Sequence, residues 1–370
     1  MHARRQDGWR IKVARQAGGL FTGASYGTTA RRMAFPVKLR AVPSLVQLTQ
    51  AFPRRRVLVV GDLVADHYIY GQTDRVSREA PVLIVRYESS DVKLGGGANA
   101  AANARSLGGQ VTTVGVLGED EMGRALRRLF KAAGIRLLAA SSEAVQTETK
   151  TRILAGGVST TRQQMLRLDR GNVGVLPPRV RLELSRLLAG AARNADAIVV
   201  SDYGAGAVTD EVRGLLRKLA AEGLPVCVDS RYQLRAFEGV TVCKPNEPEL
   251  EALTGRTIRS EKELLAAGRE AIQRLACQAL LVTRGRNGMA VFDAHGGVEL
   301  LPVHGAEEAV DVTGAGDTVI AAFTLALAAG ASAVDAARLA NVAGGLVVQK
   351  QGTATVSRQE LVRELSGLPR

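Results

Sequence analysis

The stretch Asp311-Val312-Thr313-Gly314-Ala315-Gly316-Asp317-Thr318 is followed at once by an apolar run that extends from residue 319 to residue 329. The run predicts a buried helix, and the small residues at 314–316 allow a ligand to approach the backbone at its start. Because a helix N-terminus carries unpaired N–H donors and partial positive charge, this one is a candidate anion site.

Asp317 lies in the first turn of that predicted helix. A carboxylate beside a bound anion is unfavourable unless it has a chemical role, such as taking a proton from an attacking hydroxyl group. The same residues also fit an ordinary glycine-rich turn, in which Thr313 caps the helix and Asp317 interacts with the helix dipole. The stretch alone leaves both interpretations open.

The excess of positive charge is concentrated near the N-terminus. The chain has 370 residues and a formal charge of +13, but residues 1–56 contain twelve Lys and Arg with one acid, Asp7. The remaining body is nearly neutral, so no basic stripe argues for nucleic-acid binding.

Three cysteines without a CxxC pair imply neither a disulfide framework nor a zinc site. The longest apolar run is too short to cross a membrane, and we expect a cytoplasmic protein.

We therefore expect a basic N-terminal extension over residues 1–53 and one domain over 54–370. Within the extension, three interpretations of residues 1–32 remain open: a disordered arm, a transit peptide, or sequence upstream of a later start at Met33.

The body alternates apolar β-branched runs with helical segments, from residues 57–60 to a last helix at 357–365. Such alternation predicts an α/β fold with a mostly parallel central sheet and helices on both faces. Two insertions, near 67–94 and 147–168, alternate polar and apolar residues like exposed strands. We expect them to form a small β lid.

Polar groups follow several predicted strands at the point where each ends. In an open parallel sheet, ligands bind at these carboxyl ends, so the groups together predict a ligand cleft. They are Asp62 and Asp66, Ser201 to Gly204, Asp229 to Arg231, Lys244 to Glu249, and Thr283 to Gly285.

The segment Gly95-Gly96-Gly97-Ala98-Asn99-Ala100 formally fits G-x-G-x-x-A, which would suit a dinucleotide-dependent oxidoreductase. That interpretation is weak, because the fingerprint requires a buried apolar strand directly before the first glycine. The glycines fit a substrate lying against a helix start better. No Walker-type G-x-x-x-x-G-K-[ST] occurs, and the four histidines show no triad or metal spacing.

Four motifs occur in the order found in the ribokinase/PfkB sugar kinases, which this chain resembles over residues 54 to 365. They are GGGAN at 95–99, N-x-x-E at 246–249, V-T-R-G at 282–285 and DVTGAGDT at 311–318. Within that family the chain most resembles bacterial D-glycero-β-D-manno-heptose-7-phosphate kinases. This likeness depends on the segments at 66–68, 74–82, 150–152, 167–169 and 201–204.

The resemblance implies a ribokinase-like fold, the use of ATP and Mg²⁺, a K⁺-like monovalent cation and a homodimer formed through the lid. It also implies residue roles. Asp317 would be the catalytic base, with an anion hole at Gly314, Ala315 and Gly316. Sugar hydroxyls would contact Asp66, Gly96, Gly97 and Asn99. Asn246 and Glu249 would order Mg²⁺, Thr283, Gly285 and Asn341 would line the nucleotide, and Asp311 with Thr313 would bind the monovalent cation.

A substrate that already carries a phosphate needs fixed cations, and the lid insertions supply Arg75, Arg78, Lys150, Arg152 and Arg167.

At two positions the chain departs from the heptose kinase pattern, and both departures change a cation. Ala205 stands where those kinases usually have Lys, and Asp229-Ser230-Arg231 stands where they have Asp-Pro-Lys. We expect phosphorylation of O1 of a heptose 7-phosphate, with a different sugar kinase or a non-catalytic binding module as alternatives. No H-x-G-H motif occurs, so adenylyl transfer is not expected.

Overall fold

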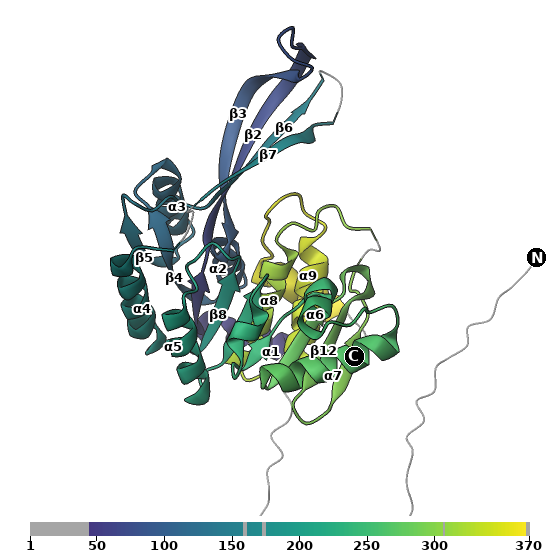
Figure 1. The fold of residues 1–370 in the computed structure, drawn as a ribbon. Coiled ribbons are helices and arrows are strands. Elements are labelled where there is room, and N and C mark those ends of the chain that lie inside the picture. Colours follow the sequence, from purple (N-terminus) through teal and green to yellow (C-terminus); the bar gives the residue numbers. More distant parts are fainter. Residues whose placement is uncertain (1–43, 158–160, 172–174, 306–307, 368–370) are drawn as a thin grey trace, which may run out of the picture. The chain divides into compact units, whose positions relative to one another are not determined.

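The computed structural model describes residues 44–157, 161–171, 175–305 and 308–367 (Figure 1). The predictions for residues 1–32 lie outside this part. In the described part, no helix is both long and apolar enough to span a membrane.

The central sheet has the strand order β13-β12-β11-β10-β9-β8-β1-β4-β5. Its strands are parallel except β12 and β13, which run antiparallel to their neighbours. The predicted mostly parallel sheet is therefore confirmed. The strands are β1 (Arg56–Gly61), β4 (Gln110–Gly118), β5 (Arg136–Ser142), β8 (Ala197–Asp202), β9 (Val226–Ser230), β10 (Val242–Cys243), β11 (Ala279–Thr283), β12 (Met289–Asp293) and β13 (Val298–Leu301).

Helices cover both faces of this sheet because successive side chains of a strand point to opposite faces. Val57 and Val59 join one apolar core, whereas Leu58 and Val60 join the other. The first core contains side chains of α2 (Gly97–Ser106), α3 (Glu121–Ala132), α8 (Ala315–Ala328), α9 (Ala333–Val347) and α10 (Arg358–Gly367). The second contains those of α4 (Pro178–Ala192), α5 (Asp210–Ala221), α6 (Glu247–Thr254) and α7 (Glu261–Leu275).

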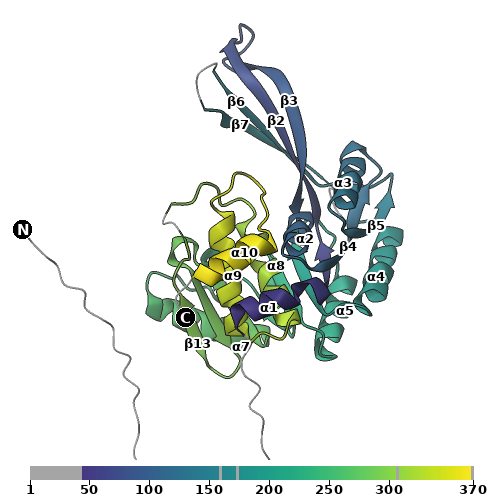
Figure 2. The same cartoon turned by 180° about the vertical axis from the view of Figure 1, so that it is seen from behind.

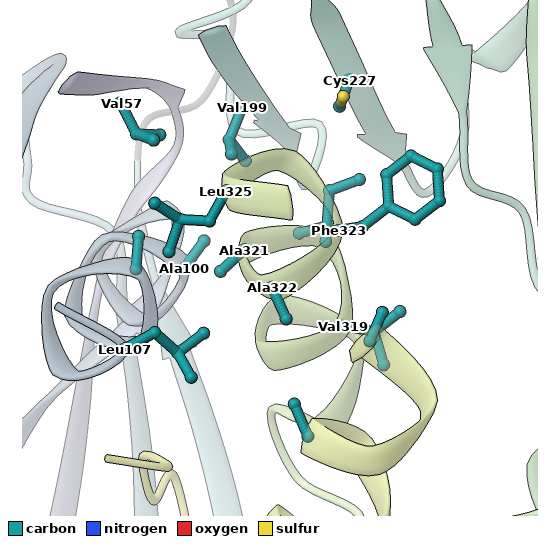
Figure 3. Close-up of a cluster of buried hydrophobic side chains, with 14 of the residues drawn as sticks. Val57, Ala100, Leu107, Val199, Cys227, Val319, Ala321, Ala322, Phe323 and Leu325 are labelled. Carbon is teal, nitrogen blue, oxygen red and sulfur yellow. The ribbon is translucent and has the colours of Figure 1, made fainter. Parts of the chain in front are cut away.

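Helix α8 is the predicted buried helix, and it is apolar on all sides because it lies between other elements. Figure 3 shows Ala321 beside Ala100 of α2, while Phe323 extends toward the strand that carries Cys227. Small alanines let the two helices approach closely, and the larger Phe323 fills space against the sheet. This packing fixes the start of α8, where Asp317 lies.

One element lies ahead of the predicted domain boundary at residue 54. Helix α1 (Leu45–Ala51) begins with a capping box between Ser44 and Gln47, and a 3₁₀ turn over 52–54 follows it. Leu48 and Phe52 are buried in the first core, and Figure 2 shows α1 on the same face as α9 and α10. The boundary at 54 is therefore too late. The helix is too short to show a clear apolar period in the sequence.

The two insertions form a second sheet with the order β3-β2-β6-β7. Its strands are β2 (Leu63–Val76), β3 (Leu83–Gly96), β6 (Thr149–Gly156) and β7 (Gln163–Arg170). The inner end of β2 is buried, but every residue of β7 is exposed, and the sheet extends away from the central sheet in Figure 1. The predicted β lid is confirmed, and we call these four strands the lid.

Candidate active site

Polar side chains from separate elements converge at the carboxyl end of the central sheet, where helix α8 begins. Asp62, Tyr203, Asp229 and Lys244 follow or end strands β1, β8, β9 and β10. Helix α8 brings Asp317 to the same place. Buried or half-buried charged groups seldom gather without a role, so this cluster is the candidate active site.

Two glycines at the start of α8 bring the backbone close to polar side chains. Gly314, the N-cap, has φ of 79°, and a Cβ atom there would lie 2.5 Å from Nδ2 of Asn99. A Cβ atom at Gly316 would lie 3.4 Å from Nζ of Lys244 and 3.6 Å from Oδ2 of Asp229. The backbone of this turn is therefore in close contact with polar side chains, and the Ala315 N–H donates to the carbonyl of Val312 at 3.2 Å.

Asp317 is buried and has two hydrogen-bond donors. Nδ2 of Asn99 donates to Oδ2 at 2.8 Å, and the hydroxyl of Tyr203 donates to Oδ1 at 3.1 Å. Burial, with a smaller contribution from Asp229, raises the pKa of Asp317 to about 7, although the two donors and Lys244 oppose the shift. A carboxylate with this pKa can accept a proton near neutral pH.

Asp62 holds the loop that carries Tyr203. Its carboxylate accepts hydrogen bonds from the backbone N–H groups of Tyr203, Ala205 and Ala207, at 2.7, 3.0 and 2.9 Å. Tyr203 is thereby placed to donate to Asp317. Because burial raises the pKa of the Tyr203 phenol well above its usual value, the hydroxyl keeps its proton. Both residues were predicted to lie at strand ends, but neither was assigned a role.

A buried ion pair joins Lys244 to Asp229, with 2.9 Å between Nζ and Oδ2. Lys244 is only 4% exposed and follows β10 directly. Sequence reasoning quoted both residues as polar groups at strand ends but did not identify the pair. The signal was weak because the two positions lie fifteen residues apart and belong to different strands.

A mostly apolar cavity of about 340 Å³ lies beside the start of α8. Its lining includes Thr283, Gly285 and Asn341, three residues predicted for the nucleotide, and Ala315 with Gly316 from the predicted anion hole. Met289, Val319 and Val348 supply apolar walls. The amide of Asn341 donates to the carbonyl of Pro302 at 2.7 Å, which fixes α9 against the cavity.

Asn246 and Glu249, predicted to order Mg²⁺, form a capping box at the start of α6. Glu249 N–H donates to Oδ1 of Asn246 at 2.8 Å, and Asn246 N–H donates to Oε2 of Glu249 at 2.9 Å. Burial raises the pKa of Glu249, with a smaller contribution from Asp229. No group of three or more His, Cys, Asp or Glu side chains in the described residues could hold a metal ion. Mg²⁺ often binds through one or two carboxylates with waters and substrate phosphates, and Glu249 fits that pattern.

Asp311, predicted for a monovalent cation, joins two loops. Its carboxylate accepts hydrogen bonds from the N–H groups of Thr313 and Gly352, at 2.9 and 2.8 Å. Burial would raise the pKa of Asp311, but these donors hold it below its usual value. The carboxylate is therefore charged, and its position ahead of α8 stays compatible with a bound cation.

The predicted sugar-binding residues lie where the lid joins the body. Asp66 is buried and paired with Arg152, with 2.6 Å between Oδ1 and Nη1. Gly97 N–H donates to the carbonyl of Asp62, and a Cβ atom at Gly96 would come within 2.9 Å of the same oxygen. Together with Asn99, these residues are brought to one place by β2, β3 and α2.

Three cations lie over aromatic rings at this junction. Nζ of Lys150 is 5.1 Å from the ring centroid of Tyr203. Lys93 and Arg152 lie 5.3 and 5.4 Å from that of Tyr68. Lys93 was missed by sequence reasoning, because a single lysine in an exposed strand carries no signal.

The remaining predicted cations of the lid lie in exposed positions. Arg75 and Arg78 are exposed near the outer end of the lid, and no interaction of their side chains appears among the described residues. Arg167 forms an ion pair with Asp169. Arg75 and Arg78 are thus not brought together with Asp317, whereas Arg167 lies opposite Arg152 in the lid sheet.

The comparisons with known proteins agree with this geometry. The family model described as "pfkB family carbohydrate kinase" matches residues 54–360. The chain is 40% identical over 314 residues to the bifunctional protein HldE of Citrifermentans bemidjiense, covering 84% of this chain and 63% of that protein. It is 41% identical over 317 residues to HldE of Methylococcus capsulatus, covering 85% and 65%. The chain thus spans less than two thirds of the length of these curated relatives.

Solved structures of low sequence identity share the fold. Arabidopsis thaliana ribokinase complexed with ribose and ATP has a TM-score of 0.66 and 23% identity, with 84% of this chain and 98% of that chain covered. Escherichia coli phosphofructokinase-2 in complex with substrates and products has a TM-score of 0.71 and 20% identity, with 85% and 100% covered. The ribokinase-like fold predicted from the sequence is therefore confirmed.

Proposed function

Since the chain belongs to the pfkB family of carbohydrate kinases, we propose that it transfers the γ-phosphoryl group of ATP to O1 of D-glycero-β-D-manno-heptose 7-phosphate. The observation that carries the proposal is the position of Asp317, between the apolar cavity beside α8 and the polar junction with the lid. The choice of sugar rests on the heptose kinase segments at 66–68, 74–82, 150–152 and 201–204.

In this mechanism Asp317 takes the proton of the sugar hydroxyl as its oxygen attacks phosphorus. Asn99 and Tyr203 hold the carboxylate in place, and its pKa of about 7 leaves it free to accept a proton. The N–H groups of Gly314, Ala315 and Gly316 stabilise charge on the phosphoryl oxygens. Positioning and electrostatic stabilisation account for most of the catalysis in this type of transfer.

We assign ATP to the cavity beside α8, with its base among the apolar side chains and its phosphates at the helix N-terminus. Mg²⁺, when bound, would neutralise the phosphate charges, and we assign the ordering of its waters to Asn246 and Glu249. Asp311 and Thr313 are the proposed monovalent cation site. The complexes of Arabidopsis thaliana ribokinase with ribose and ATP and of Escherichia coli phosphofructokinase-2 with potassium support the use of ATP and such a cation in this fold.

The phosphate already present on the substrate needs cations under the lid. Lys93, Lys150 and Arg152 lie at the junction of lid and body, whereas Arg75 lies in the exposed outer part of the lid. In the described residues, neither Lys93 nor Lys150 forms an ion pair with an acid. We assign the substrate phosphate to these junction cations, and the sugar hydroxyls to Asp66, Asn99 and the glycines 96 and 97.

The lid also supports a homodimer. Its outer surface exposes Leu166 and Leu168 on β7 and Tyr87 on β3. An edge strand with exposed apolar residues is prone to pair with another chain. Size-exclusion chromatography with light scattering tests the proposal. A single species of twice the chain mass is expected, and Leu166→Lys with Leu168→Lys should give monomers. A wild-type monomer would contradict it.

The kinase proposal is tested by coupled ADP release from the purified chain, with a matched panel of phosphorylated and unphosphorylated sugars. Heptose 7-phosphate should give a much higher kcat/KM than the same heptose without phosphate. Equal values for the two would remove the sugar-phosphate assignment. Turnover of a different sugar phosphate would instead favour the alternative, a family member that acts on another sugar. The departures from the heptose kinase pattern at Ala205 and Ser230 point to that alternative.

A further inference from the structure

Lys244 is a lysine side chain enclosed by the protein at the candidate active site. It is 4% exposed, and its ammonium pairs with Asp229 at 2.9 Å. Burying an ammonium costs several kcal/mol unless a partner compensates for the lost water. Burial alone would lower the pKa of Lys244, but Asp229, Glu249 and Asp317 raise it, so the side chain stays charged.

The ammonium faces the first turn of α8. A Cβ atom at Gly316 would lie 3.4 Å from its Nζ, and Gly316 directly precedes Asp317. Backbone contacts hold the chain at Lys244 and directly after it. Lys244 N–H donates to the carbonyl of Val228 at 2.8 Å, and the capping box of α6 begins two residues later at Asn246. Lys244 thus presents a rigidly placed positive charge to the turn that holds the predicted anion hole.

An ammonium has three N–H donors, and in the part of the chain that the structure describes Lys244 has one ionic partner, Asp229. The remaining donors lie beside the backbone at Gly316, in the turn that begins α8. Donors that converge in this way suit an anion with several oxygens, such as a phosphoryl group.

We propose that Lys244 binds the phosphoryl group during its transfer and that Asp229 is a positioning residue that orients the lysine. The proposal rests on the kinase function proposed above. It also bears on the departure at Ala205, because Lys244 supplies a cation that position 205 lacks. Arg231 is exposed and lies 5.9 Å over the ring of Tyr232, so it does not occupy the same place.

The reaction balances without a proton from Lys244. The bond from O1 of the sugar to the γ-phosphorus forms while the bond from that phosphorus to the β-γ bridging oxygen breaks. The bonding electrons leave with ADP, and the proton of O1 passes to Asp317. Lys244 keeps its charge throughout and interacts most strongly with the phosphoryl oxygens in the transition state.

Lys244→Met in the full-length chain tests the proposal, with Arg231→Met as the matched control. Loss of a donor to a transition-state oxygen costs about 10²–10³-fold in kcat, so we expect a loss of this size for Lys244→Met and less than about tenfold for Arg231→Met. Calorimetry should show that ADP still binds while the complex of ADP with aluminium fluoride, a mimic of the phosphoryl group in transfer, is strongly weakened. A wild-type kcat and unchanged aluminium fluoride binding in Lys244→Met would overturn the assignment.

Removing one member of a buried ion pair can unfold a protein, so a second variant guards against that outcome. Asp229→Asn combined with Lys244→Met removes both charges and leaves neither buried alone. It should fold and show the same loss of kcat and of aluminium fluoride binding. A folded double variant with wild-type values of both would refute the role of Lys244. Absence of phosphoryl transfer by the wild-type chain would count against the kinase proposal instead, and the calorimetric comparison would still test Lys244.

Discussion

The two ends of the central sheet both carry a hollow with charged residues, but they hold those charges differently. At the amino end, a hollow of about 790 Å³ at the start of β1, β4 and β5 is lined by Arg56, Arg105, Arg136 and Arg186, all of them exposed. At the carboxyl end, the cavity of about 340 Å³ is smaller, yet Asp62, Asp317 and Lys244 at that end of the sheet are at most 4% exposed.

The difference shows what distinguishes a reactive site from a charged surface. An exposed arginine keeps its water and costs the fold little. A buried carboxylate or ammonium must be compensated by hydrogen bonds or an opposite charge, as Asn99, Tyr203 and Asp229 do here. The size of the hollow is therefore a poorer guide to chemistry than the burial and contacts of its charged groups.

The largest expected effect comes from Asp317→Asn, which removes the proposed base without changing its size. Loss of a general base typically costs about 10²–10⁴-fold, and we expect kcat to fall within that range. ATP binding should persist, because removing a negative charge near the phosphates cannot weaken it electrostatically. The matched control is Asp196→Asn at the amino end, where the carboxylate pairs with Arg56 and kcat should be unchanged. Retention of more than about a tenth of the rate in Asp317→Asn would rule out this carboxylate as the base.

The pH dependence of the wild type gives the next largest effect. Because the pKa of Asp317 is about 7, kcat/KM should rise about tenfold per pH unit below that value and level off above it. The raised pKa favours the protonated carboxyl in the folded state. The contribution of this protonated carboxyl to the free energy of unfolding is therefore present below about pH 4 and lost as the pH rises through 7. Asp317→Asn should consequently unfold at a higher temperature than the wild type above pH 7. A rate profile that stays flat from pH 5.5 to 8 would contradict the assignment.

A smaller effect is expected at the lid junction. A hydrogen bond to a charged group contributes about 1.5–3 kcal/mol, so Lys150→Ala or Lys93→Ala should raise KM for the sugar phosphate by roughly ten- to a hundredfold. KM for ATP should not change, because neither lysine lines the cavity beside α8. Arg75→Ala, in the exposed outer part of the lid, serves as the control with no effect. If Arg75→Ala raises KM and the lysine variants do not, the substrate phosphate lies further out than proposed.

The smallest effect is expected at the amino end. Arg136→Ala with Arg186→Ala removes two exposed cations from the larger hollow. Surface substitutions of this kind usually change stability by less than about 0.5 kcal/mol. Steady-state kinetics and thermal unfolding should both match the wild type. A large loss of activity would show that the amino end takes part in function and would undermine the contrast drawn above.

The sequence predicted the parts of the fold whose signals are local. Val57 to Val60 read as a buried strand because all four are apolar and β-branched or leucine, and α8 as a buried helix because its apolar run is long. Strand β5, the hairpin β12–β13 and the short helices α1 and α6 did not show a clear period, since each is brief or partly exposed. Their formation depends on packing against distant elements rather than on local pattern.

The candidate active site was likewise predictable only where its signal is local. Asp317 and the small residues before it form one continuous motif, so the sequence identified them. The partnership of Lys244 with Asp229, and that of Tyr203 with Asp62, depends on which strands are neighbours in the sheet. Arg75 was chosen for its charge and lies in the exposed outer part of the lid, whereas Lys93 lies at the junction. The order of the strands decided the first two cases, and the distance along the lid decided the third; a single sequence reveals neither.

The most direct test of the central claim is ³¹P nuclear magnetic resonance of the product formed from ATP and heptose 7-phosphate by the wild-type chain. A sugar bisphosphate is expected, in which the new phosphorus signal couples to the anomeric proton and grows in step with ADP. That result would place the transfer at O1, as we propose. Release of ADP together with inorganic phosphate alone, or a new signal that couples to another carbon-bound proton, would contradict the account.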